Sequence, residues 1–566
     1  MKFAKLKKKL GLILITSAIV LTSFGFFAFD DDNNFKIVQN LDIYYSLFRE
    51  LNLFYVDETD PEKLVKTSID AMLRSLDPYT TYFPESELER FNFMTTGKYG
   101  GIGALIRKSG EYAVIVESYE NFPAYKAGLK PGDIIIEINE KSTRGENLTD
   151  ISNQLKGIPN TSLNIVVNRP GLTKPMKKTL VREIIKIKSV PYYGMLNEKI
   201  GYINLINFTK DAYKEVKNAL VDLKKNNKAK SIILDLRTNP GGLLLESVHI
   251  VNLFVEKEQE IVSTKGKVKH FDNTYKTRFS PIDMEIPLII LVSRMSASAS
   301  EIVAGSMQDL DRAVIIGQRT FGKGLVQTTR PLSFNAQLKV TAAKYYIPSG
   351  RCIQALDYTH RNDDGSVGQI PDSLISEFLT KNRRKVYDGG GIMPDIVIKP
   401  EGLSKITTSL YTKNLIFDYT TQYGIIHDSI PPISDFSFTD DDYQNFINFL
   451  EGKDFDYQTK SEDHLNKLIE TAKKEKYYDN ASDEFASLQL KLAHDKSKDL
   501  RVFKEEIKQL IAKEIVGRYY FQNEKIQISL VNDIQINKAI ELLSDLDNYY
   551  SILNGIEKID LNNFPD

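Results

Sequence analysis

A serine tract and a lysine that follows it could supply hydrolytic chemistry without a histidine. Ser298 is the middle serine of Ser296-Ala297-Ser298-Ala299-Ser300-Glu301-Ile302, and Lys323 lies 25 residues later. A serine hydroxyl attacks a carbonyl when a neighbouring base takes its proton, and only a neutral lysine can do so. Lowering a lysine pKa from about 10.4 to about 7 disfavours its charged form by roughly 4–5 kcal/mol. Burial beside Phe321 and Val326 could have that effect, so the pair predicts a serine/lysine hydrolase.

The residues after the serines space their apolar side chains as a helix does. This run covers residues 301–307, which predicts that Ser298 lies at or just before a helix N-terminus. Unpaired backbone N–H groups and a partial positive charge gather at such an end. We therefore expect the N–H of Ala299 to stabilise an oxyanion.

A second segment has the order strand, glycine turn and helix. Residues 231–236 are typical of a buried strand, the turn is Arg237-Thr238-Asn239-Pro240-Gly241-Gly242, and apolar residues then recur at helical spacing over 243–255. Two glycines let the backbone approach a ligand and turn an N–H towards it. Gly241 or Gly242 is therefore the expected second oxyanion donor.

The chain resembles the carboxyl-terminal processing peptidases, also called tail-specific proteases. The resemblance covers about residues 35–400 and rests on a series of motifs in matching order and spacing. They are residues 76–83 (LDPYTTYF), 235–242 (DLRTNPGG), 296–302 (SASASEI), 320–327 (TFGKGLVQ), 346–351 (YIPSGR) and 390–396 (GGIMPDI). The resemblance implies a serine endopeptidase with Ser298 as nucleophile, Lys323 as general base, and the amides of Ala299 and Gly241 or Gly242 as oxyanion hole.

The third catalytic residue has two candidates, because members of this family have been described with Asp or Gln in that role. Asp309 follows Ser298 by eleven residues, which is roughly 16 Å along a helix at 1.5 Å per residue. Gln327 follows Lys323 by four residues and stays on the same side in a helix or a strand. We predict that Gln327 orients the amine and that Asp309 is structural.

Residues 98–187 change to strand and turn character and resemble a PDZ domain. Two segments carry this resemblance, Tyr99-Gly100-Gly101-Ile102-Gly103-Ala104-Leu105 and residues 124–139 (AYKAGLKPGDIIIEIN). In PDZ domains a glycine-containing loop binds a terminal carboxylate, and the peptide adds as a strand. The expected peptide-binding residues are Gly100, Gly101, Ile102, Gly103 and Ala104. Alternation of Ile102, Ala104 and Ile106 predicts a pocket for an apolar C-terminal side chain.

The expected fold class is mixed α/β and multidomain, an α/β serine protease core with an inserted PDZ domain and helical segments at both ends. The predicted parts are 1–32, a signal anchor or signal peptide; 33–95, a helical cap or dimerisation segment; 96–187, the PDZ domain; 188–400, the protease core; and 401–566, a helical extension.

The N-terminus predicts export. Five lysines within residues 1–9 precede an uncharged apolar stretch over 10–29, which is long enough for a ~30 Å hydrocarbon core. We expect a retained anchor in the inner membrane of a bacterium, with the rest on the extracytoplasmic side. A small-x-small cleavage site at Ser23-Phe24-Gly25 is the alternative.

The composition of the chain limits the kinds of ligand and binding partner that we expect. A formal net charge of -1 over 566 residues gives no electrostatic case for nucleic acid. The single cysteine, Cys352, excludes an internal disulfide, and the absence of an HExxH pattern argues against a metal. No cofactor is expected. The expected partners are proteins or peptides with free C-termini, with a homo-oligomer and an envelope adaptor as further possibilities.

Three alternatives compete with a protease. Residues 317–324 nearly fit a phosphate-binding loop, but Gly324 offers no hydroxyl for magnesium and the following residues favour a strand. A histidine-based hydrolase would use His249, the only histidine near a motif, but the chain has no Gly-x-Ser-x-Gly. The third alternative is an envelope scaffold that binds peptide tails through its PDZ domain without cleaving them.

Overall fold

The computed structural model describes residues 31–556 except 363 and 401. The predicted membrane span over 10–29 lies outside these residues. Within the described part, no helix combines the length and apolar character needed to cross a membrane. The chain divides into two compact units, Met1–Tyr82 and Phe83–Asp566.

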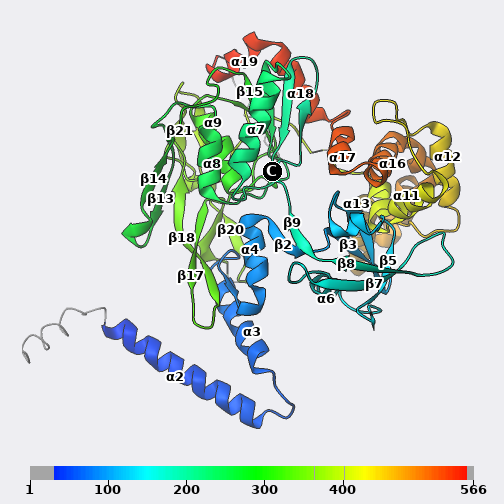
Figure 1. Cartoon of the computed structure of the whole chain (residues 1–566), viewed down its shortest axis with the longest axis horizontal. Helices are drawn as coiled ribbons and strands as arrows, with labels where there is room; N and C mark the ends of the chain where they lie inside the picture. Colours follow the sequence, from blue (N-terminus) through cyan, green and yellow to red (C-terminus); the bar gives the residue numbers. More distant parts are fainter. Residues whose placement is uncertain (1–30, 363, 401, 557–566) are drawn as a thin grey trace, which may run out of the picture. The chain divides into compact units, whose positions relative to one another are not determined.

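Within its described residues, the first unit contains helices α2 (Asp31–Phe54) and α3 (Pro61–Arg74) (Figure 1). Asp60 caps α3 by accepting from the Lys63 N–H, and Pro61 fits the first helical turn because it needs no donor there. Helix α2 leaves large apolar side chains in solvent, among them Phe35, Val38, Leu41 and Tyr45, each more than 60% exposed. Exposed apolar surface of this extent is typical of an interaction site.

The PDZ part is an antiparallel sheet whose buried side chains form a core of their own. Its order is β3-β4-β5-β7-β8, with the short β6 (Lys141–Ser142) beside β5 and helix α6 (Leu148–Leu155) nearby. The strands are β3 (Ala104–Ser109), β4 (Tyr112–Ser118), β5 (Ile134–Ile138), β7 (Ser162–Asn168) and β8 (Met176–Val181). A separate ribbon of β2 (Lys98–Gly101) and β9 (Glu183–Lys186) connects this sheet to the preceding and following parts of the chain.

The protease core is built on a six-stranded sheet of order β10-β11-β12-β15-β16-β23. All neighbouring pairs are parallel except β10 with β11. Continuous apolar runs form these strands because both faces of the sheet are covered. The strands are β10 (Tyr192–Met195), β11 (Ile200–Asn204), β12 (Ser231–Asp235), β15 (Leu288–Val292), β16 (Val314–Gly317) and β23 (Ile396–Val397).

Different helices cover the two faces of this sheet. Leu288, Ile290 and Val292 pack with α7 (Ala212–Lys225), α8 (Leu244–Val251) and α9 (Ala299–Asp309). The alternate residues Ile289 and Leu291 pack with α18 (Ile534–Ser544) and α19 (Leu546–Leu553), the red helices near β15 in Figure 1. The last helices of the predicted helical extension, residues 401–566, therefore cover the second face of the core sheet.

A second, antiparallel sheet lies beside this core. It contains the hairpin of β17 (Leu325–Pro331) and β18 (Gln337–Tyr346), followed by β13 (Glu260–Gly266) and β14 (Asn273–Lys276). Strand β17 begins two residues after Lys323. This confirms the predicted strand at a place where a phosphate-binding loop needs a helix.

The remaining C-terminal residues form a helical module with its own core. Thr439 and Thr459 start two of its helices with capping boxes. Its helices are α10 (Lys405–Thr412), α11 (Leu415–Ile426), α12 (Asp440–Phe449), α13 (Lys460–Lys474), α14 (Ser482–Leu492), α15 (Lys496–Val502), α16 (Lys504–Tyr519) and α17 (Gln522–Ser529). Leu410, Ile416, Phe446 and Ile511 are among its buried residues.

Candidate active site

The three serines of the predicted tract have different environments. Ser296 and Ser300 are fully buried, and their hydroxyls donate to the carbonyl oxygens of Leu236 (2.8 Å) and Asn239 (2.8 Å). Ser298, immediately before α9, is only partly buried and has φ 55° and ψ -114°. A non-glycine residue in this region stores backbone strain, which is common at functional sites. The structure thus separates Ser298 from its two structural neighbours.

A buried carboxylate joins the serine segment to the lysine segment. Glu301 Oε2 accepts from the backbone N–H of Ser298 (2.7 Å) and of Lys323 (2.9 Å). Its Oε1 accepts from the Thr320 hydroxyl (2.6 Å) and the Gly322 N–H (2.7 Å). Burial raises the pKa of the Glu301 carboxyl, whereas these four donors favour its charged form. One side chain therefore fixes the backbone of both proposed catalytic residues.

Sequence reasoning gave Glu301 no role, although a signal was present. The spacing Ser298-x-x-Glu301 is that of a capping box, in which the third helical residue reaches back to the N-cap amide. A second missed residue is Asn239, which is fully buried. Its carbonyl accepts from Ala297 N–H (3.2 Å) as well as from Ser300, so it ties the glycine turn to the serine tract.

The structure brings the predicted oxyanion donors to the serine. A methyl group added at Gly241 would lie 2.9 Å from Ser298 Cβ and 3.0 Å from Ala299 N, and Gly241 has φ +102°. The Gly241 N–H already donates to Asn239 Oδ1 (2.9 Å). Among the residues described, no acceptor takes the N–H of Gly242 or of Ala299, the latter being at the first turn of α9. These two amides are open to a ligand oxygen.

Lys323 is partly buried and Phe321 beside it is 46% exposed. The backbone around the lysine is firmly held, because Phe321 N–H also donates to Ser296 O (3.0 Å). Gln327 lies in β17, and its amide donates to Thr341 Oγ1 (3.3 Å) and Leu325 O (3.4 Å).

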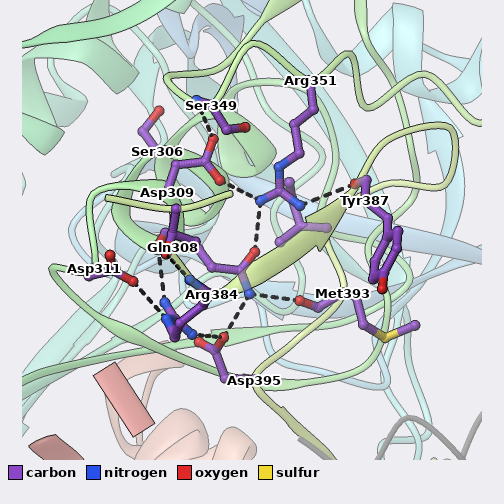
Figure 2. A network of polar contacts seen from close by, with 12 residues as sticks. Ser306, Gln308, Asp309, Asp311, Ser349, Arg351, Arg384, Tyr387, Met393 and Asp395 are labelled. Atoms are coloured by element: carbon purple, nitrogen blue, oxygen red, sulfur yellow. Dashed lines mark hydrogen bonds and ion pairs between the residues drawn. The ribbon is translucent and has the colours of Figure 1, made fainter. Parts of the chain in front are cut away.

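Asp309 occupies a different, enclosed network (Figure 2). It ends α9 and accepts from Arg351 Nη2 (2.7 Å) and from the Ser349 N–H (2.9 Å), with both ionic side chains at most 1% exposed. Gln308 bridges this pair to Asp395, which in turn pairs with Arg384. Figure 2 shows these side chains turned towards one another. The Asp309 carboxylate is thus committed to holding the loop of residues 349–351.

The predicted peptide-binding residues fall in two elements and the loop between them. Gly100 and Gly101 belong to β2 and pair with β9, so they are not part of the loop as predicted. Only Ile102 and Gly103, which has φ +71°, connect β2 to β3, where Ala104 begins the strand. Ile102, 3% exposed, and Ala104 pack in the PDZ core.

The side chains considered for other chemistries are packed. His249 in α8 contacts the rings of Tyr213 and Phe279, and burial together with Arg278 lowers its pKa. Burial raises the pKa of the Cys352 thiol. Over residues 31–556, with the two gaps noted above, no cluster of three or more His, Cys, Asp or Glu side chains could hold a metal ion.

Known families match three segments of the chain. Residues 114–169 match the PDZ domain, residues 199–360 match Peptidase family S41, and residues 406–543 match the family described as "Probable PDZ-protease, C-terminal helical domain". These matches confirm the predicted fold class and the resemblance to C-terminal processing peptidases.

Relatives in bacteria agree with these matches. The carboxy-terminal-processing protease of Bartonella bacilliformis is 35% identical over 381 residues, which cover 67% of this chain and 83% of the relative. The probable CtpA-like serine protease of Staphylococcus aureus (strain COL) is 36% identical over 348 residues, which cover 61% of this chain and 69% of the relative. Among solved structures, the photosystem II D1 C-terminal processing protease aligns at 26% identity with a TM-score of 0.34. The alignment covers 64% of this chain and 93% of that structure's chain. On the strength of the matched families and of the Bartonella relative, the chain belongs to the carboxy-terminal-processing proteases of peptidase family S41 and is a serine-type endopeptidase with a PDZ domain.

Proposed function

We propose that this protease cleaves protein tails with a Ser298/Lys323 dyad. The observation that carries the proposal is the Glu301 carboxylate, which binds the backbone N–H groups of both residues. A shared anchor of this kind keeps nucleophile and base in register, as catalysis by proximity requires. The strained backbone of Ser298 at the start of α9 also supports this assignment.

In this mechanism, neutral Lys323 takes the proton of the Ser298 hydroxyl while its oxygen attacks the scissile carbonyl. The oxyanion that forms accepts from the N–H of Ala299 and of Gly242, and from Gly241 if its bond to Asn239 is exchanged. Lys323 then gives the proton to the leaving amine, which leaves an acyl group on Ser298. Water hydrolyses this ester by the same proton transfers in reverse order.

The third member of the site is proposed to be Gln327 rather than Asp309. Asp309 is enclosed with Arg351, and removing it would leave a buried guanidinium without its anion. Gln327 Nε2 makes only long contacts, at 3.3 and 3.4 Å, so its amide is free to turn towards Lys323 or a water molecule. In a folded protein, full activity of Gln327→Ala would contradict this role.

We further propose that the PDZ domain binds the free C-terminus of the substrate through Ile102, Gly103 and the edge of β3. An envelope location, with the N-terminus as membrane anchor, rests on the lysine-rich start and the apolar stretch of residues 10–29. We also propose that the protein self-associates through the exposed apolar face of α2. Fractionation of cells and light scattering of the pure protein test these two proposals.

The test of the dyad is cleavage of a disordered protein with a free apolar C-terminus by the full chain and its variants. Ser298→Ala and Lys323→Ala should each abolish cleavage while the fold is retained. Ser333→Ala and Lys344→Ala, at exposed positions of the β17–β18 hairpin, are the matched controls and should cleave like the parent. Cleavage by either dyad variant would contradict the assignment. Binding without cleavage by the parent would favour the non-cleaving scaffold.

A further inference from the structure

The PDZ domain contacts the C-terminal helical module at an aromatic ring. Two guanidinium groups lie over the ring of Phe417, in α11. Arg107 of β3 lies 3.8 Å from the ring centroid and Arg518 of α16 lies 4.5 Å from it. Guanidinium groups over an aromatic ring attract its electron-rich face. This stack joins a PDZ strand to two helices that lie more than 300 residues later in the chain.

Further contacts surround the stack. Arg518 Nη1 donates to Pro131 O of the PDZ domain (3.0 Å), while its other nitrogens bind α11 at Phe417 O, Thr420 and Thr421. A methyl group at Gly132 would lie 2.6 Å from Thr421 Cγ2, so the side chain of Thr421 packs directly on this glycine. Tyr125 of the PDZ domain meets the ring of Phe521 edge-on, with centroids 5.2 Å apart.

One charged group in this interface, Arg107, is incompletely compensated. The Nε and Nη2 atoms of Arg107 are buried and make no hydrogen bond to any described residue. Burial lowers the pKa of Arg107 and brings that of Arg518 to about 10, and it raises the pKa of Asp418 in α11. Burying guanidinium nitrogens without hydrogen-bond partners opposes association. The docked state therefore carries a free-energy cost at Arg107, which favours opening of the contact.

The strand that docks here is also the strand that would receive a substrate tail. Strand β3 is at the edge of its sheet and pairs only with β4 among the described strands. Ala104 and Ile106 pack towards the PDZ core, whereas Arg107, the next residue, reaches Phe417. Successive side chains of a strand point to opposite faces, so one strand serves both contacts. A tail that adds to β3 therefore acts on an element that the helical module holds.

The PDZ domain is otherwise linked to the protease core by the β2–β9 ribbon. Strands β2 and β9 pair along their length, and next to them the Ile187 N–H donates to Gly97 O (3.0 Å). A two-stranded ribbon is weakly stable alone and can act as a hinge.

We propose that the Arg107–Phe417–Arg518 stack is a latch, by which the C-terminal helical module holds the PDZ domain in the resting state until a tail binds to β3. The proposal rests on the proposed tail recognition and proteolysis, and it adds the surface that regulates them. If docking and tail binding exclude each other, loosening the latch must tighten tail binding, because two-state coupling is reciprocal.

The experiment uses two loosening variants, each with a matched control. Gly132→Ala places a methyl against Thr421, and Gly128→Ala is its control because Gly128 also has a positive φ but no atom within 4 Å. Phe417→Leu removes the ring that both guanidiniums contact. Its control is Phe449→Leu, which removes a ring whose described ring and cation contacts, with Tyr419, Phe446 and Lys453, all lie within the helical module. In the Ser298→Ala background, a labelled peptide ending in a free leucine carboxylate is titrated by fluorescence anisotropy.

The loosening variants should bind this peptide about 5-fold or more tightly than their controls, within the usual range of coupling between sites. With Ser298 intact, they should cleave a disordered substrate with an amidated C-terminus about 5-fold faster. Hydrogen exchange over residues 415–426 should be faster in Gly132→Ala than in Gly128→Ala without any peptide.

Equal peptide affinity and equal exchange in variants and controls would overturn the latch. A different set of outcomes would contradict the proposed function. If no form cleaves any substrate while exchange and affinity change as expected, the latch stands and the dyad assignment falls. If no form binds the peptide, exchange over α11 alone decides whether the interface holds the PDZ domain.

Discussion

At the scale of single residues, the site depends on buried polar groups that are not themselves catalytic candidates. Glu301 and Asn239 are fully buried, and each connects segments that are distant in sequence. Every donor around Glu301 is satisfied by one of its two oxygens. Changing such a group alters the positions of its neighbours rather than the chemistry itself.

Glu301→Gln should lower kcat/KM by about 10-fold or more. The amide keeps one acceptor oxygen but turns an NH₂ group towards two of the four donors. Unsatisfied buried donors cost about 1–3 kcal/mol each, so the melting temperature should fall as well. Glu246→Gln, which changes a half-buried carboxylate bound to the Tyr213 N–H, is the control. A variant with parental kcat/KM would show that Glu301 does not position the dyad.

Gly241→Ala should abolish cleavage even if the protein folds. Its methyl would lie 2.7 Å from Ala297 O and 2.9 Å from Ser298 Cβ, and φ +102° is unfavourable for alanine. Gly145→Ala, with φ +75° and no atom within 4 Å, carries similar backbone strain without the collision and should stay active. The rate of phosphonylation by a fluorophosphonate probe, in which fluoride is the leaving group, measures the effect at Ser298, the proposed nucleophile. Normal labelling of Gly241→Ala would refute a close approach of the turn to the nucleophile.

At the scale of elements, the helical module contains a pH-dependent clamp. His494, between α14 and α15, bonds Glu462 through Nδ1 (2.8 Å) and Asp456 through Nε2 (3.3 Å). These acids raise the pKa of His494, and the pKa of Glu462 falls to about 2. Tyr457 lies against the imidazole and Lys496 pairs with Asp456. The clamp joins the start of α13 to the end of α14.

The module should therefore be most stable at mildly acidic pH. The histidine contribution is complete below about pH 6.5, the unfolded value, and is lost as pH rises through the higher folded pKa. The Glu462 contribution is present above about pH 4.5 and disappears as pH falls towards 2. Amide exchange over residues 456–500 should accelerate between pH 6.5 and 8 beyond its chemical rate. His494→Gln should remove that acceleration, whereas His464→Gln on the exposed face of α13 should keep it.

At the scale of the whole molecule, the PDZ domain is an insertion whose two ends meet. Lys98 pairs with Lys186 across the β2–β9 ribbon, so residues 98–187 can be replaced by a short glycine-serine linker. If the PDZ domain restrains the resting enzyme, this deletion should raise basal cleavage of a disordered substrate several-fold, because the resting state is removed. It should also abolish the preference for a free C-terminus. A folded deletion variant without activity would show instead that the PDZ domain is needed to build the active site.

The sequence by itself determined the local elements and the identity of the motifs. An apolar run predicted β12, helical spacing placed Ser298 at or just before the start of α9, and β-forming residues after Lys323 predicted β17. Six motifs in order carried the resemblance to the family. These features are readable because hydrophobic periodicity and turn chemistry act between near neighbours.

Only the tertiary structure decided which distant residues meet. Asp309 pairs with Arg351 rather than with the lysine, Glu301 joins Ser298 to Lys323, and α18 and α19 cover the second face of the core sheet. The contact of Arg107 with Phe417 likewise spans more than 300 residues. No local pattern encodes such pairings, because they arise when long loops close and separate surfaces are buried together.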